Sequence, residues 1–410
     1  MKYSHYNLEA EYKGNYCIFN TRTGACIVLD RSEYDMLKRG KLLDIVDNLH
    51  KLGFFVGDSL DETQLVRDTI RNNILRDKEH IRSHTIYTTT FCNAHCPYCF
   101  EKSFSCESMT QKTASEVARY IIHQQDVAKK LYIIWFGGEP MLNPKVMDII
   151  SGEIDKELSE DVEFRTSMYT NGLLLTKEWI EHAKCNWHLK SVQITLDGMK
   201  ETYENVKQFS VPNAFERVIS NIRDMLEAGL RVQIRLNYDE FTFLETLSLI
   251  EQLRLDFKGF KKVYVYAHKI FREENVDNSK QTTAAYDFAI LEKLIECGFC
   301  ADILATIKRN MNTCLAGSEY SRLYLPNGKI IKCNRAMDCV VGDISGAVYK
   351  DEVNKWQSNR LNENCYYCKL LPVCGGGCIY EFLNGKNGCM NSEIAIKQKL
   401  QYYMKNTVGE

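Results

Sequence analysis

Hydrophobic and polar positions show two alternating periodicities between residue 84 and about residue 300. From His84 onward, runs with a two-residue repeat alternate with stretches that have a helical repeat, which predicts strands and helices in turn. The predicted strands are 85–90, 131–136, 163–169, 190–196, 231–237 and 262–266. The predicted helices are 111–126, 144–158, 176–184, 213–228, 242–255 and 283–297. Serial β/α units build parallel sheets, so we expect an α/β fold with a partial, barrel-like sheet and a site at its C-terminal strand ends.

The first 80 residues have a different pattern. Three short apolar runs at 16–19, 25–29 and 54–56 are strand-like, and residues 20–24 have turn composition. Ser32 is the expected N-cap of a helix that reaches Leu37, and a second helical pattern runs from Leu42 and ends at Gly53. A hairpin, two helices and a short strand predict a small winged-helix-like module.

Alternation within the predicted strands indicates which side chains enter the barrel. Apolar residues such as Val232 and Ile234 should face the helices, which turns the polar residues between them inward. The expected inward set is Gln193, Thr195, Asp197, Gln233, Arg235, Asn237, Tyr264, Tyr266 and His268. Polar groups that converge at one mouth suit a ligand site, although some could merely hydrogen-bond each other or water.

Composition narrows the class of protein. The 410 residues carry a formal charge of −2, so no basic field suggests nucleic acid. We expect no membrane partner and a cytoplasmic location, since no long apolar run or signal-peptide core is apparent. The 17 cysteines therefore point to metal ligation in a reducing compartment rather than to disulfides.

The first strand leads directly into a C-x3-C-x2-C motif, formed by Cys92, Cys96 and Cys99. A [4Fe–4S] cluster normally takes four cysteines, so three would leave one iron open for chemistry. A zinc site with a distant fourth ligand is the alternative.

This motif resembles the signature of the radical S-adenosylmethionine (radical SAM) superfamily, in which SAM chelates the open iron. Gly137, Gly138 and Glu139, with Pro140, match the family's GGEP motif, whose backbone and carboxylate meet the SAM amino group. The resemblance further implies SAM contacts from Tyr98, Asn171, Thr195 and Asp197, and Arg235 is the candidate partner of the SAM carboxylate. A structural role for Arg235 is the alternative.

The C-terminal cysteines resemble the SPASM domain, an appendage of radical SAM enzymes that carries auxiliary [4Fe–4S] clusters. The matching positions are Cys314, Gly328, Cys333, Cys365, Cys368, Cys374, Cys378 and Cys389. A zinc ribbon is the competing interpretation. The resemblance implies three [4Fe–4S] clusters in all.

The family's ligation assigns Cys365, Cys368, Cys374 and Cys389 to one auxiliary cluster. The other would be held by Cys314, Cys333 and Cys378, with either Cys339 or an open iron in the fourth position. Sulfatase-maturing relatives have a cysteine and an aspartate where this chain has Tyr320 and Asn334, which counts against that activity.

The resemblance gives three expected domains: a leader-peptide recognition module at 1–80, a radical SAM partial (β/α)6 barrel at 84–300 and a SPASM domain at 301–410. The expected enzyme is a peptide maturase that abstracts a hydrogen and installs a cysteine thioether, as in sactipeptide and ranthipeptide maturases. Its partners would be a precursor peptide and a flavodoxin- or ferredoxin-type electron donor. Carbon–carbon cross-linking, epimerisation, sulfatase-type oxidation and a non-catalytic electron-transfer protein are the alternatives.

Overall fold

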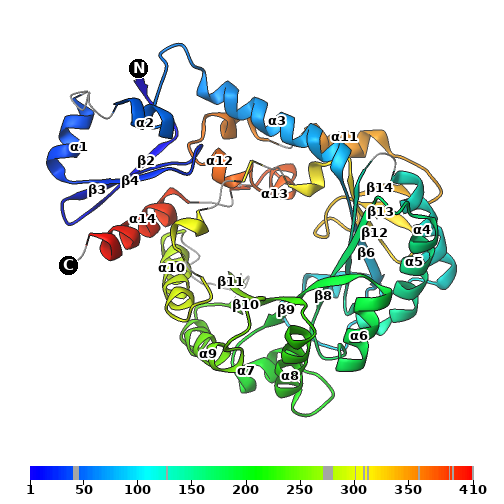
Figure 1. The fold of residues 1–410 in the computed structure, drawn as a ribbon. Helices are drawn as coiled ribbons and strands as arrows, with labels where there is room; N and C mark the ends of the chain where they lie inside the picture. The colour runs from blue at the N-terminus through cyan, green and yellow to red at the C-terminus, as the bar shows by residue number, and fades with distance from the viewer. Residues whose placement is uncertain are drawn as a thin grey trace.

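The computed structural model is built around one nine-stranded sheet, shown with its helices in Figure 1. The structure describes residues 1–39, 46–125, 128–270, 280–300, 302–307, 310–311, 314–358, 361–386, 388–389 and 392–408. The sheet has the order β11-β10-β9-β8-β7-β6-β12-β13-β14. Its first six strands are β6 (Ile81–Thr89), β7 (Lys130–Gly137), β8 (Glu163–Thr170), β9 (Leu189–Leu196), β10 (Arg231–Tyr238) and β11 (Val263–Lys269). All six are parallel, which confirms the predicted barrel-like sheet.

Helices cover the outer face of this sheet and curve it into an open barrel (Figure 1). They are α4 (Gln111–Gln124), α5 (Pro144–Glu157), α6 (Lys177–Asn186), α7 (Lys200–Lys207), α8 (Ala214–Glu227), α9 (Phe243–Asp256) and α10 (Lys280–Glu296). All but α7 were predicted. The short α7 follows β9 and belongs to the candidate site.

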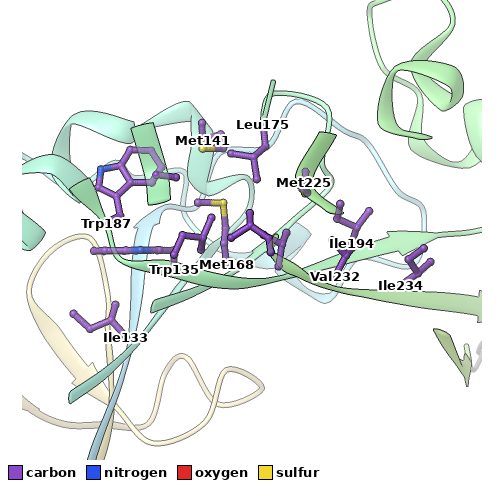
Figure 2. Packing of buried hydrophobic residues seen from close by; sticks show 14 of the residues in the cluster. Ile133, Trp135, Met141, Met168, Leu175, Trp187, Ile194, Met225, Val232 and Ile234 are labelled. Carbon is purple, nitrogen blue, oxygen red and sulfur yellow. The ribbon is translucent and has the colours of Figure 1, made fainter. Parts of the chain in front are cut away.

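The main hydrophobic core lies between the outer face of the sheet and these helices. Figure 2 shows Trp135, Met168, Ile194 and Val232 from neighbouring strands packed together in this layer. Each of these side chains is at most 1 % exposed. Because the apolar residues of alternate positions enter this core, the intervening polar residues face the barrel interior, as predicted.

The cysteine-rich region continues the barrel sheet. Strand β12 (Ser321–Tyr324) pairs in parallel with β6, for example Leu323 with Thr85. Strands β13 (Lys329–Ile331) and β14 (Val340–Asp343) then add antiparallel pairs. The helices α11 (Lys350–Ser358), α12 (Leu371–Cys374) and α13 (Ile379–Leu383) follow. Backbone hydrogen bonds therefore join the expected second and third domains.

The N-terminal module contains an antiparallel sheet of β2 (Asn7–Tyr12), β3 (Asn15–Asn20) and β4 (Cys26–Leu29). Helices α1 (Arg31–Lys38) and α2 (Val46–Leu52) follow. The prediction of Ser32 as N-cap was wrong. Asp30 caps α1 in a reciprocal capping box with Glu33, because its carboxylate reaches the Glu33 amide. The predicted helical positions 42, 43 and 45 lie outside the described residues.

The two faces of the N-terminal sheet pack against different parts of the chain. Ile18 and Leu29 pack with Leu37 of α1, while Cys17 and Phe19 face Leu400 of α14 (Glu393–Thr407). The C-terminal helix thus completes the N-terminal module (Figure 1), a contact that no local pattern predicts.

A long helix joins the N-terminal module to the barrel. Helix α3 (Glu62–His80) runs directly into β6, and β1 (Lys2–Tyr3) pairs with β5 (Phe55–Val56) beside it. Among the described helices, none is long and apolar enough to span a membrane.

Candidate functional site

The loop after β6 carries the three cysteines of the first motif. Burial of the Cys92 thiol raises its pKa to about 11. The nearby charges of Glu139, Cys96 and Cys99 add to the shift. The three sulfurs therefore act on one another electrostatically. Once deprotonated, these three cysteines are the ligand set that would bind an iron–sulfur cluster with one open iron.

The glycine pair of the GGEP motif packs against this cysteine loop. A Cβ on Gly137 would lie 2.1 Å from the Thr89 carbonyl oxygen, and one on Gly138 would lie 2.3 Å from that of Phe91. Gly137 also has φ of +113°. Glycine is therefore required here for contact between two backbones within the protein. The sequence had suggested close approach of the chain to SAM as the reason for these glycines.

Glu139 is completely buried and connects the ends of two strands. Its carboxylate accepts hydrogen bonds from the Thr170 hydroxyl at 2.7 and 2.8 Å, the Asn171 amide at 2.9 Å and the Met141 amide at 3.1 Å. Burial raises the pKa of Glu139, although these hydrogen bonds partly offset the shift. The side chain fixes the mouth of the barrel, and its contact with SAM stays a prediction.

Asn171, at the end of β8, reaches back toward the cysteine loop. Its Nδ2 donates to Asn93 Oδ1 at 2.7 Å and lies 4.0 Å from Cys92 Sγ. The third strand and the first motif therefore meet at the same edge, as the sequence predicted.

A buried polar network lies on the other side of the cysteine loop. The Tyr98 hydroxyl donates to Asp197 Oδ1, and Asn237 Nδ2 donates to both groups at 3.0 Å. Lys207 Nζ lies 2.9 Å from Asp197 Oδ2, and the two side chains are only 5 % and 2 % exposed. The Lys207 carbonyl also accepts from the His95 amide at 2.8 Å.

Lys207 was missed by the sequence analysis. Burial opposes its charge, but Asp197, Tyr98 and Cys96 together keep its pKa well above the usual value. It is therefore a permanent cation next to the cysteine loop. The run of helix formers at 200–207 after the Asp197-Gly198 turn was the available signal, since it places Tyr203 and Lys207 on one helix face.

Arg235 lies further inside the barrel than this network. Its Nε donates to Asn237 Oδ1 at 2.9 Å, and Thr195 is its register partner on β9. On β11, the Tyr266 hydroxyl donates to Gln193 Oε1 at 2.8 Å across the interior. These contacts agree with the predicted inward orientation. The contact of Arg235 with a SAM carboxylate remains a prediction.

Four C-terminal cysteines surround one cavity. Cys365, Cys368, Cys374 and Cys389 line a cavity of about 40 Å³ together with apolar side chains such as Leu371 and Phe382. Burial raises the pKa of Cys365, and the other three cysteines add to the shift. Within the described ranges, no three His, Cys, Asp or Glu side chains are arranged to hold a single metal ion.

Cys314, Cys333 and Cys378 form a second set. Burial raises the pKa of Cys333 to about 11, with further contributions from Cys314 and Cys378. Burial also raises the pKa of Cys339, but the charges that add to this shift belong to Asp338 and Glu352. Cys333 thus lies within electrostatic range of Cys314 and Cys378, whereas the negative charges that act on Cys339 are those of Asp338 and Glu352.

Three consecutive glycines connect the two sets. Gly375, Gly376 and Gly377 all have positive φ, at 69°, 100° and 77°. A Cβ on Gly377 would lie 2.3 Å from the Gly388 carbonyl oxygen, and the adjacent Cys378 amide donates to that same oxygen at 2.8 Å. The backbone therefore folds tightly between Cys374 and Cys378, which only glycine allows at these positions.

Comparison with known proteins identifies the barrel. Residues 86–250 match the family model described as the radical SAM superfamily. The radical SAM cyclopropyl synthase TigE of Paramaledivibacter caminithermalis is 21 % identical over 391 residues, which cover 85 % of this chain and 79 % of TigE.

Two solved structures share the fold. The structure of anSMEcpe with bound AdoMet has a TM-score of 0.62 at 16 % identity and covers 80 % of this chain and 98 % of its own. SuiB of Streptococcus suis has a TM-score of 0.53 at 13 % identity and covers 96 % of this chain and 99 % of its own. The second likeness therefore extends beyond the barrel.

Proposed function

We infer that this chain, a radical SAM enzyme by the domain it carries, matures a ribosomally made peptide. The observation that carries this proposal is the cavity lined by Cys365, Cys368, Cys374 and Cys389, together with the electrostatic effect of Cys314 and Cys378 on Cys333. A likeness to TigE over most of both chains supports radical SAM chemistry, since the match includes regions on either side of the radical SAM domain. The three domains expected from the sequence, with SPASM-type auxiliary clusters, are part of the same proposal.

Cys92, Cys96 and Cys99 would hold the SAM-binding [4Fe–4S] cluster. Together with SAM, this cluster supplies a 5′-deoxyadenosyl radical that can take a hydrogen atom from a substrate. The protein's own contribution is positioning. Glu139 and the two glycines hold the strand ends rigid against the cysteine loop, and Asn171 closes one side of it.

Lys207 is a second candidate cation for the methionine end of SAM. Its charge acts on Cys96 and on Glu139, whereas Arg235 is connected to Tyr98 of the cysteine loop through Asn237. We therefore assign the SAM carboxylate to the neighbourhood of Lys207 in preference to Arg235.

The auxiliary clusters would serve as the electron acceptor. When a thioether forms, the peptide loses one hydrogen atom to the radical, one proton to solvent and one electron to an auxiliary cluster. The set of Cys314, Cys333 and Cys378 offers three protein thiolates, which leaves one position for a cysteine of the substrate. A flavodoxin- or ferredoxin-type protein is the proposed electron donor.

A specific observation favours a second product class. TigE is a cyclopropyl synthase, so its likeness to this chain supports carbon–carbon bond formation as the reaction class. This reaction removes the same two hydrogens and needs the same electron acceptor. The two products differ in whether a thiol is consumed.

The N-terminal module is the proposed site for the leader of the precursor. Strands β2 and β4 are the two edges of its sheet, and an edge strand offers unpaired backbone groups to an extended peptide. One structure of anSMEcpe contains both AdoMet and the Cp18Cys peptide, with a TM-score of 0.61 to this chain. This supports a peptide as the substrate class for the shared architecture.

The deciding experiment is mass spectrometry of cysteine-containing peptides encoded beside this gene, each co-expressed anaerobically with the enzyme. Loss of two hydrogens with one thiol no longer alkylatable supports the thioether. The same loss with every thiol still free supports carbon–carbon bonding. The Cys92→Ala variant is the control, because it retains both auxiliary sets. An unchanged peptide mass, despite 5′-deoxyadenosine production, would contradict the proposed oxidation.

A further inference from the structure

We propose that Arg235 is the specificity residue that binds a carboxylate of the substrate peptide inside the barrel. This inference rests on the proposed function and adds a substrate class to it: peptides that carry a carboxylate next to the modified residue. The carboxylate could belong to an Asp or Glu side chain or to the peptide C-terminus, and the experiment below separates the two.

The guanidinium of Arg235 has unused donors. Within the part of the chain that the structure describes, Asn237 Oδ1 is its one hydrogen-bond partner, and it contacts that oxygen through Nε alone. Both terminal nitrogens therefore remain available for a bidentate carboxylate, the geometry that a guanidinium matches best. Arg235 is partly exposed, so a ligand that enters the barrel can reach these donors.

The surroundings of Arg235 are open and aromatic. Tyr169 on β8 is 37 % exposed and Tyr264 on β11 is 47 % exposed, although both lie on the inner face of the sheet. Burial raises the pKa of Tyr169 and of Tyr266, and the Arg235 charge partly opposes each shift. These rings are thus within electrostatic reach of Arg235 and form apolar walls with polar tips, which suits a peptide.

The inner face also lacks competing anions near Arg235. Among the inward positions of the described strands β6 to β11, the one carboxylate is Glu163, which pairs with Arg165 at the opposite end of the barrel. Asp197, at the mouth, is occupied by Lys207. Arg231 lies on the same strand and face as Arg235, with its guanidinium over the Tyr264 ring at 5.5 Å. Two arginines on the inner face of β10, with no carboxylate beside them among the described inward strand positions, favour a negatively charged ligand.

The test uses the reconstituted enzyme with SAM and three synthetic hexapeptide libraries. The first contains one Asp and an amidated C-terminus, the second replaces that Asp with Asn, and the third has Asn with a free C-terminal carboxylate. Anaerobic equilibrium dialysis and mass spectrometry measure which peptides bind. We expect the wild type to enrich the first or the third library about tenfold over the second, which identifies the carboxylate as side chain or terminus.

Arg235→Gln should abolish this enrichment, and Arg235→Lys should retain part of it. Arg231→Gln is the matched control, because it removes the same charge from the same strand and face and should keep the selectivity. Equal loss in both variants would overturn a specific site in favour of general electrostatics. A weakened SAM affinity in Arg235→Gln with unchanged peptide selection would assign Arg235 to SAM and overturn the inference.

Failure of the Arg235 inference can be distinguished from failure of the proposed function. A wild type that binds peptides with no preference for carboxylates overturns the role of Arg235 and leaves peptide maturation standing. A wild type that binds none of the libraries and leaves co-expressed peptides unchanged overturns both. Circular dichroism of each variant confirms that the fold is retained before binding is compared.

Discussion

Lys207 Nζ and Asp197 Oδ2 lie 2.9 Å apart in an ion pair that is almost completely buried. Asp197 directly follows the fourth barrel strand, and Lys207 is the last residue of the short helix α7. The pair holds Tyr98 of the cysteine loop through Asp197 Oδ1. One salt bridge therefore connects the wall of the barrel to the loop that carries the proposed cluster.

Removal of this lysine should destabilise the fold strongly. Lys207→Met leaves Asp197 as an unpaired buried charge, so we expect the free energy of unfolding to fall by about 3–5 kcal/mol. Anaerobic urea denaturation measures the change. Lys200→Met on the same helix is the control, because its ion pair with Glu216 is about half exposed and should be worth less than about 1 kcal/mol. Equal stability of the two variants would contradict a structural role for the buried pair.

Gly137→Ala should prevent the cysteine loop from packing. The new Cβ would clash with the Thr89 carbonyl oxygen at 2.1 Å, and φ of +113° is strained for alanine. We expect loss of cluster incorporation, measured as iron per chain after reconstitution. Gly152→Ala is the matched control, since Gly152 lies within α5 with no atom in the way and the change should stabilise by about 0.5–1 kcal/mol. Normal iron content in Gly137→Ala would show that the loop can adapt.

The two candidate ligands Cys365 and Cys339 should differ in iron binding. Cys365→Ala removes one wall of the four-cysteine cavity, so we expect the loss of up to about four iron atoms per chain. Cys339→Ala should leave the iron content unchanged, because the surroundings of Cys339 are Asp338 and Glu352. Iron analysis and electron paramagnetic resonance report both results. A reduced iron content in Cys339→Ala would make Cys339 the fourth ligand after all.

Stability should decrease between pH 7 and pH 5 because of His84. This histidine is completely buried, and its Nδ1 lies 2.8 Å from the Tyr324 hydroxyl. Burial, and then the charges of Arg322 and Arg82, lower its pKa to about 3. The unfolded chain, with a histidine pKa near 6.5, binds a proton that the folded chain excludes. The buried neutral His84 therefore makes its full contribution to stability above pH 6.5. As the pH falls to 5, the free energy of unfolding decreases by about 2 kcal/mol.

Denaturation curves at both pH values test this sign. His84→Gln should show a smaller difference between pH 7 and pH 5 than the wild type, since glutamine does not titrate. An identical pH dependence in the two proteins would assign the effect to other groups.

Hydrogen exchange can test leader recognition by the N-terminal module. A precursor peptide with its leader should slow amide exchange in one edge strand, β2 or β4, whereas the leaderless core peptide should not. Deletion of residues 1–80 is a poor alternative, because it would expose Leu400 and Met404 of α14 to water. Unchanged exchange in both strands would remove the recognition role.

Local periodicity and motif spacing determined much of this protein. The six barrel strands and their inward polar residues followed from alternation, because one face of each strand must be apolar to pack against the helices. The cysteine spacings, and Gly137 with Gly138, were equally visible, since each lies within one short segment. The strand order then brought these segments to a common edge.

Only the tertiary structure decided the contacts between distant segments. The sequence could not show that Lys207 neutralises Asp197, that α14 covers the N-terminal sheet, or that β12 extends the barrel through β6. It also left open whether Cys339 joins Cys333, and in the structure the negative charges that act on Cys339 are those of Asp338 and Glu352. Such choices depend on which buried charges and apolar faces meet after folding. These contacts are determined by the packing of the whole chain, because a local sequence pattern does not show which distant residue a side chain will contact.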